Sequence, residues 1–152
     1  MKRNRLQIDQ LERKMKAFAG ARDTSVPSIG WLRTVRTSLG MTLQQMGDKL
    51  NMTKQSAREI EMREMDYSIT LKSLRDAANA LEMELVYGLV PKDGSLDELI
   101  ERKAKKLAAE IVLRTSNSMR LEDQGISEQR IKAAIEERTM RIKNELPKSL
   151  WD

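Results

Sequence analysis

The side chains that most often carry covalent or metal chemistry are missing from this sequence. It contains no cysteine and no histidine, which excludes thiolate nucleophiles, imidazole bases and metal sites built on Cys or His. Its carboxylates fall on helix faces opposite cations, and pairs such as Glu136 and Glu137 are most simply solvated residues. The sequence has no glycine-rich phosphate loop. We therefore expect a protein that is not an enzyme and that uses no metal ion and no cofactor.

The stretch from Gly40 to Glu61 indicates a different chemistry, that of a binding surface built on two short helices. It reads as two helices of roughly two turns, joined by about three or four residues, with the small residue Gly47 inside the first. A small residue there lets the second helix cross the first closely. We expect the inner faces to be buried by Met46, Leu50, Met52, Ala57 and Ile60. This pattern is typical of a helix-turn-helix, which holds its second helix outward for a major groove about 12 Å wide.

The helices around this pair are predicted from apolar spacing and from capping residues. Ser28 is expected to cap a helix that ends at Gly40 and whose apolar face carries Ile29, Leu32, Val35 and Leu39. The next three helices are expected to be capped by Thr42, Thr53 and Thr70, with Asn51 in the left-handed conformation. The inward face of the last of these helices is expected to consist of Leu71, Leu74, Ala77, Ala78 and Leu81.

The segment from Glu84 to Val90 breaks the helical pattern and is the one stretch that reads as a β-strand. Leu85, Tyr87 and Leu89 would share one side of this strand. Because a lone strand leaves backbone groups unpaired, we expect it to pair antiparallel with the same strand of a second copy, giving a homodimer. The alternative is an extended connector.

Both flanks are predicted to be helical. An N-terminal helix over residues 4–19 precedes Gly20, and a capping box at Ser95 and Glu98 opens a helix that reaches the low 120s. Gly125 would break that helix, and Ser127 would cap a last helix that ends at Pro147. The expected organisation is a basic N-terminal helix at 1–22, a helix-turn-helix domain at 28–91 and a C-terminal helical extension at 95–152. The predicted fold class is therefore mainly all-α, with one short dimerising strand.

Positive charge is concentrated at the N-terminus. The chain carries a net charge of +5, and residues 1–22 hold seven Lys and Arg against two Asp and Glu. Such a segment can contact phosphates without regard to base sequence, and the alternative is a solvated helix face. The lack of cysteine, of a signal peptide and of a long apolar run predicts a cytoplasmic protein with no membrane partner.

Residues 29–82 resemble the Cro and phage-repressor class of helix-turn-helix domains, the XRE family. The resemblance rests on the spacing of Leu32, Arg36, Gly40, Thr42, Met46, Gly47, Leu50, Met52, Thr53, Ile60 and Glu61, followed by Leu71, Leu74, Ala78 and Leu81. It implies a lambda-repressor-like fold and a structural ion pair between Arg36 and Glu61. Two positions depart from the family pattern, because Leu43 stands where many members have Gln and Arg63 where many have Gly.

The same resemblance implies which side chains contact DNA. It places the recognition surface on Thr53, Lys54, Gln55, Ser56, Arg58 and Glu59. Gln55 can pair bidentately with adenine, and Lys54 or Arg58 can donate to guanine or to phosphate. Thr53 and Ser56 can reach phosphate or a thymine methyl group, and Glu59 can accept from cytosine or pair with a neighbouring cation. Gln44 and Arg63 are expected to add phosphate contacts.

The arrangement of the whole chain is similar to that of a narrower family, mobile mystery protein A. The similarity rests on the basic first helix, on Gly30 to Arg33, on the stretch from Glu82 to Pro91 and on the helical tail. Genes of that family tend to lie beside one for a Fic-domain protein. The resemblance implies a transcriptional regulator, an autorepressor or antitoxin, that binds a palindromic double-stranded DNA operator as a homodimer. The alternative is an inhibitor of a neighbouring Fic-domain toxin that acts through a flanking helix, 4–19 or 127–146, with DNA binding secondary.

Overall fold

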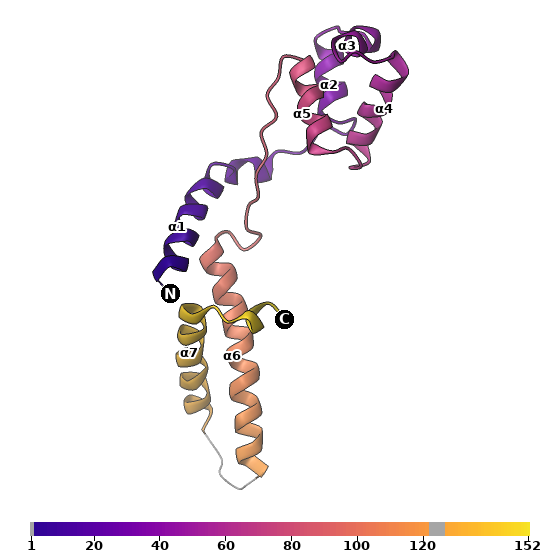
Figure 1. Cartoon of the computed structure of the whole chain (residues 1–152). Coiled ribbons are helices and arrows are strands. Elements are labelled where there is room, and N and C mark those ends of the chain that lie inside the picture. The colour runs from indigo at the N-terminus through magenta and orange to yellow at the C-terminus, as the bar shows by residue number, and fades with distance from the viewer. Residues whose placement is uncertain (1, 122–126) are drawn as a thin grey trace. The chain divides into compact units, whose positions relative to one another are not determined.

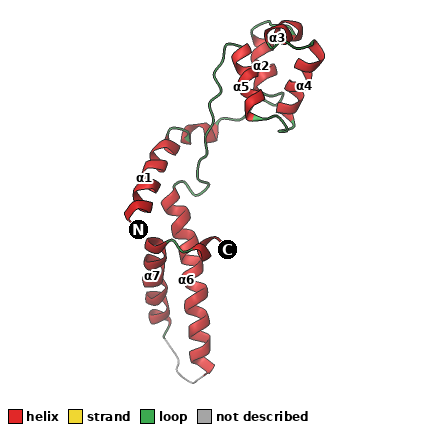
Figure 2. Ribbon diagram, viewed as in Figure 1, coloured by secondary structure: helices red, strands yellow, loops and turns green. Residues whose placement is uncertain are grey.

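The computed structural model describes residues 2–121 and 127–152 and is almost entirely helical (Figure 1). Seven α-helices lie in this described part, together with two short 3-10 helices, Ala19–Asp23 and Lys148–Trp151. Figure 2 shows helices and loops, and the same residues contain no strand. The prediction of a mainly all-α chain is confirmed.

The chain divides into two compact units, which we describe separately. The central unit consists of residues 20–88, and the terminal unit joins residues 1–19 to residues 89–152. The N-terminal helix thus belongs to the same unit as the C-terminal helices. The apolar pattern of the sequence does not predict this grouping.

Four short helices make up the central unit: α2 (Trp31–Ser38), α3 (Leu43–Lys49), α4 (Lys54–Met65) and α5 (Leu71–Ala80). Its core is formed by buried side chains from three of them and from the residue after α5, namely Leu32, Met46, Ala77 and Leu81. The predicted caps are confirmed, because Thr42, Thr53 and Thr70 each accept a hydrogen bond from the backbone N–H three residues on. Asn51 takes the expected left-handed conformation, with φ of 54°.

The beginning of α2 differs from the prediction. The N-cap position is occupied by Gly30, with φ of 83°, and not by Ser28. Three apolar residues expected to face inward are exposed, because each lies at or beyond a helix end and so misses the buried stripe: Ile29, Leu39 and Leu71. Helix α4 continues to Met65, one turn past Glu61.

The predicted strand is not found. Residues 82–90 form neither helix nor strand, because within the described chain no other segment pairs with them. The division between the two units also falls inside this stretch, after Gly88. In a single copy of the chain the segment is an extended connector, which is the alternative that the sequence left open.

The terminal unit contains α1 (Lys2–Lys16), α6 (Leu96–Leu121) and α7 (Glu128–Glu145). Helices α6 and α7 lie side by side (Figure 1). Ile100, Ala104 and Ala108 follow each other at intervals of one turn on α6 and are buried against Ile142 and Leu150. The two alanines are fully buried, and their small side chains let the neighbouring helix approach closely.

Residues from two distant parts of the chain cap the beginning of α6. Ser95 accepts a hydrogen bond from the backbone N–H of Glu98 at 3.1 Å, which is one of the two bonds of the predicted capping box. The carboxylate of Glu12 on α1 accepts a second one from the N–H of Leu96 at 2.6 Å. Ser127 caps α7 as predicted. The helix break expected at Gly125 lies outside the described residues.

Candidate nucleic-acid interface

Helices α3 and α4 approach each other closely at Gly47. The two helices are joined by the four residues 50–53. A Cβ atom added to Gly47 would lie 2.8 Å from the carbonyl oxygen of Met52 and 3.1 Å from that of Thr53. Since real Cβ atoms do not approach backbone that closely, no larger residue fits without moving the turn. The prediction that a small residue is needed here is confirmed.

A buried ion pair joins α2 to the middle of α4. Arg36 donates from Nε to Oε2 of Glu61 at 2.8 Å and from Nη2 to Oε1 at 3.0 Å. Its remaining nitrogen, Nη1, donates to the carbonyl of Met41 at 2.9 Å. Both side chains are buried, and hydrogen bonding to Glu61 raises the pKa of Arg36 above its ordinary value. The pair implied by the family resemblance is therefore present in the structure.

A second carboxylate of α4 caps the beginning of α2. Glu64 accepts hydrogen bonds from the backbone N–H groups of Trp31 and Leu32, at 2.7 and 2.8 Å. A Cβ atom on Gly30 would lie 2.9 Å from Oε1 of Glu64, so a glycine at this position leaves room for the carboxylate. Sequence reasoning missed this contact. The one local signal is a helix that begins without a Ser, Thr, Asp or Asn next to it.

Three long polar side chains at the beginning of α4 are free to bind something else. Lys54, Gln55 and Arg58 are exposed on its first two turns. Their side chains make no hydrogen bond or ion pair to any residue that the structure describes. Because Glu61 and Glu64 bind the other half of α4 to α2, the helix that carries these three side chains is held in place.

The other predicted contact residues are partly engaged within the chain. The hydroxyl of Thr53 accepts from the N–H of Ser56 and donates to its hydroxyl, at 3.1 and 3.0 Å. Glu59 lies 3.9 Å from Arg63, and both side chains are exposed. In α3, the amide of Gln44 donates to Asp48 at 2.9 Å. A ligand must therefore compete with these weak surface contacts.

The three residues predicted to make the dimer contact do not share one environment. Leu85 is half-buried and lines an apolar pocket of about 360 Å³ with Trp31, Leu74 and Met83. Tyr87 is 59 % exposed and Leu89 is 79 % exposed. Apolar area thus remains uncovered along this stretch in the single chain.

The described residues contain no group of three or more carboxylates that could bind a metal ion. None of the described helices is both long and apolar enough to cross a membrane.

Comparison of this chain with protein-family models, with curated proteins and with solved structures finds no match.

Proposed function

We propose that this protein is a sequence-specific DNA-binding transcriptional regulator of the XRE helix-turn-helix type, acting in the cytoplasm. The observation that carries the proposal is the beginning of α4. Lys54, Gln55 and Arg58 are exposed there and have no partner among the described residues. Their amide and cationic groups match the acceptors and donors that base edges and phosphates offer in a major groove.

The geometry of α4 suits this role. The helix has 12 residues and starts with the Thr53 cap, so its first turns can point at a duplex while its last turns stay attached to α2. In this proposal α4 is the recognition helix and α3 lies across the DNA backbone. Gln44 and Arg63 reach phosphate once they leave Asp48 and Glu59.

The first experiment measures binding of the full chain to the DNA upstream of its own gene. We expect protection of a palindromic site, as an autorepressor requires. The affinity should fall by about 10³–10⁵ between about 50 and 200 mM salt, because several phosphates are neutralised on binding. Affinity for that DNA no greater than for an unrelated duplex would contradict sequence-specific regulation.

A matched pair of variants assigns the contact to α4. Gln55→Ala should weaken binding to the protected site by about 1–3 kcal/mol and relax the preference at one base position. Gln129→Ala, an exposed change on α7, should bind like the parent protein. Competition binding with single-base variants of the site measures both effects. Equal losses in the two variants would argue against α4 as the recognition helix.

We also propose that the protein binds its operator as a homodimer. In one chain, residues 84–90 lack a strand partner in the described part, and Val86, Tyr87 and Leu89 are exposed. Antiparallel pairing with a second copy would satisfy the backbone groups and cover these side chains. Sedimentation of the full chain should give a dimer, and Tyr87→Asp should shift it towards monomer and weaken operator binding. If the parent protein binds its operator as a monomer, the proposed homodimer is wrong.

Inhibition of a neighbouring Fic-domain toxin is the second candidate function, and it is compatible with autorepression in an antitoxin. One observation favours it: Leu6 and Leu11 on α1 are exposed, so α1 keeps apolar area for a partner. We expect the full chain to co-purify with the product of the adjacent gene. Leu6→Glu combined with Leu11→Glu should abolish that association while leaving DNA binding unchanged.

A further inference from the structure

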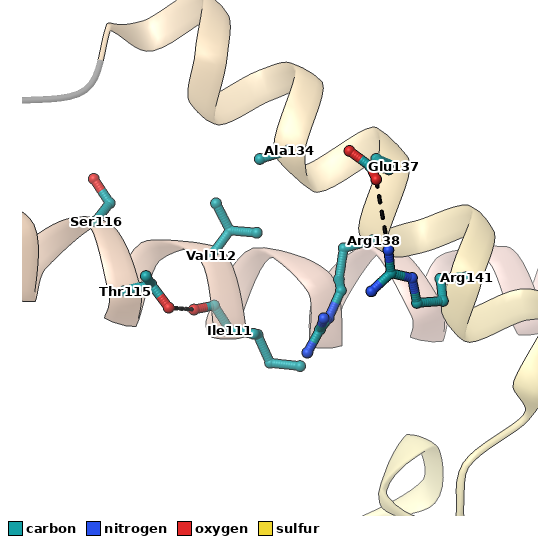
Figure 3. Close-up of a pocket in the computed structure, with 8 residues that line it drawn as sticks. All are labelled: Ile111, Val112, Thr115, Ser116, Ala134, Glu137, Arg138 and Arg141. Atoms are coloured by element: carbon teal, nitrogen blue, oxygen red, sulfur yellow. Dashed lines mark hydrogen bonds and ion pairs between the residues drawn. The ribbon is translucent and has the colours of Figure 1, made fainter.

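A pocket of about 360 Å³ opens between α6 and α7 within the terminal unit (Figure 3). Its apolar wall consists of Ile111 and Val112 from α6 and Ala134 from α7. Figure 3 shows Ser116 and Arg138 at opposite ends of the pocket, with Val112 and Ala134 between them. The pocket therefore combines an apolar middle with two polar ends.

The hydroxyl of Ser116 is the first polar end. The residue is only 2 % exposed, and its Oγ has no hydrogen-bond partner among the described residues. Neighbouring hydroxyls in the same unit are satisfied by their own helix, because Thr115 donates to the carbonyl of Ile111 and Thr139 to that of Ile135. Ser116 lacks such a bond, so its hydroxyl is available to a ligand in the pocket.

The guanidinium of Arg138 is the second polar end. This side chain is half-buried and makes no ion pair within the described part of the chain. The other two charged residues of the pocket neutralise each other, since Arg141 lies 3.6 Å from Glu137. The positive charge of Arg138 is therefore the one left to attract an anion.

We propose that this pocket binds an extended carboxylate that carries a second hydrogen-bonding group at its far end. The carboxylate accepts a forked pair of hydrogen bonds from Arg138, the chain lies on Val112 and Ala134, and the far group bonds to Ser116. The rise along α6 from Ile111 to Ser116 is about 7.5 Å, which an aliphatic acid of medium chain length can span. The pocket lies within the terminal unit, whereas the residues assigned to DNA belong to the central unit.

The test uses the full chain and three probes of the same length: octanoate, ω-hydroxyoctanoate and uncharged octanol. Binding is followed through the backbone amide resonances of Val112 and Ala134, which report on this pocket and not on other surfaces. We expect ω-hydroxyoctanoate to bind with a Kd of about 0.1–1 mM, octanoate to bind several-fold more weakly, and octanol not to bind measurably. Absence of shifts with both acids would overturn the proposal.

Three variants separate the two ends of the site. Arg138→Gln should weaken both acids by about tenfold or more, since the forked charge-assisted bonds are lost. Arg130→Gln, an exposed change on the same helix, should have no effect. Ser116→Ala should remove the advantage of ω-hydroxyoctanoate over octanoate and leave octanoate unchanged. Unaltered binding in Arg138→Gln, or a hydroxyl preference that survives in Ser116→Ala, would refute the assignment.

Discussion

Two glutamates of α4, three residues apart, connect that helix to α2 in different ways. Glu61 binds a buried guanidinium, and Glu64 binds two backbone N–H groups. The first contact could be predicted because the resemblance pairs Arg36 with Glu61. The second contact could not be predicted, because it depends on the last turn of α4 packing against the first turn of α2. Local sequence does not specify that tertiary contact.

Removal of Glu61 should strongly destabilise the central unit. Glu61→Ala leaves the charge of Arg36 buried and unpaired, so we expect a loss of about 3–5 kcal/mol in the free energy of unfolding. Chemical denaturation monitored by circular dichroism measures this loss in the free energy of unfolding. Replacing both partners, as Arg36→Met with Glu61→Leu, should recover much of the loss. A double variant as unstable as Glu61→Ala would show that the charge itself is not the cause.

Removal of Glu64 should have a smaller effect. Glu64→Ala deletes two hydrogen bonds at a helix N-terminus, and we expect a cost of about 1–3 kcal/mol. Glu59→Ala on the same helix is the control, because its pair with Arg63 at 3.9 Å is exposed and contributes little. Thermal unfolding of the two variants side by side gives the comparison. Equal stability of Glu64→Ala and Glu59→Ala would argue that the cap is not energetically important.

At the scale of elements, success in prediction depends on whether the signal is local. Thr42, Thr53 and Thr70 cap helices through residues three positions away, so the sequence identifies them correctly. The cap predicted at Ser28 is wrong, because Glu64 supplies that function from a distant part of the chain. The predicted strand fails for a similar reason, since a strand exists only with a partner and the single chain supplies none in its described part.

Substitution of two glycines tests whether the close approach of α3 to α4 matters for stability and for DNA binding. Gly47→Ala would place a methyl group against the backbone of the turn, and we expect a destabilisation of about 1–3 kcal/mol and weaker DNA binding. Gly20→Ala is the matched control, because nothing lies within 4 Å of its added Cβ atom. Denaturation midpoints and operator affinity are measured for both. A neutral Gly47→Ala would mean that α4 can shift without consequence.

At the scale of the whole molecule, the pairing of α1 with the C-terminal helices was beyond sequence reasoning. The apolar stripe of α1 is visible in the sequence, but its partner is not. Glu12 reaches Leu96 across 84 positions of the chain, and Ile8 packs on the core of the terminal unit. The sequence therefore predicted the helices of both flanks and left their grouping open.

The pH dependence of stability follows from composition and from two hydrogen-bonded carboxylates. Hydrogen bonding lowers the pKa of Asp93, through Arg102, and that of Asp66, through Ser68. Each group therefore stabilises the folded chain above the ordinary carboxyl pKa of about 3.9, and this contribution is lost as the pH falls through the lowered value.

We expect the urea concentration at the unfolding midpoint to stay constant between about pH 6 and 8, because the chain has no histidine or cysteine to titrate there. At pH values below about 4 this midpoint should decrease. Asp93→Asn should make the acid fall shallower. A midpoint that rises on acidification from pH 5 to 3 would contradict this sign.

The contact of Glu12 with the beginning of α6 also bears on how the chain is made. During synthesis α1 leaves the ribosome before its partners in α6, which follow only after residues 20–88 have been translated. We expect the central unit to fold during translation, at a stage when the apolar stripe of α1 is still exposed. For that interval α1 is open to chaperones or to another chain, and the terminal unit can assemble only after α6 and α7 have been translated.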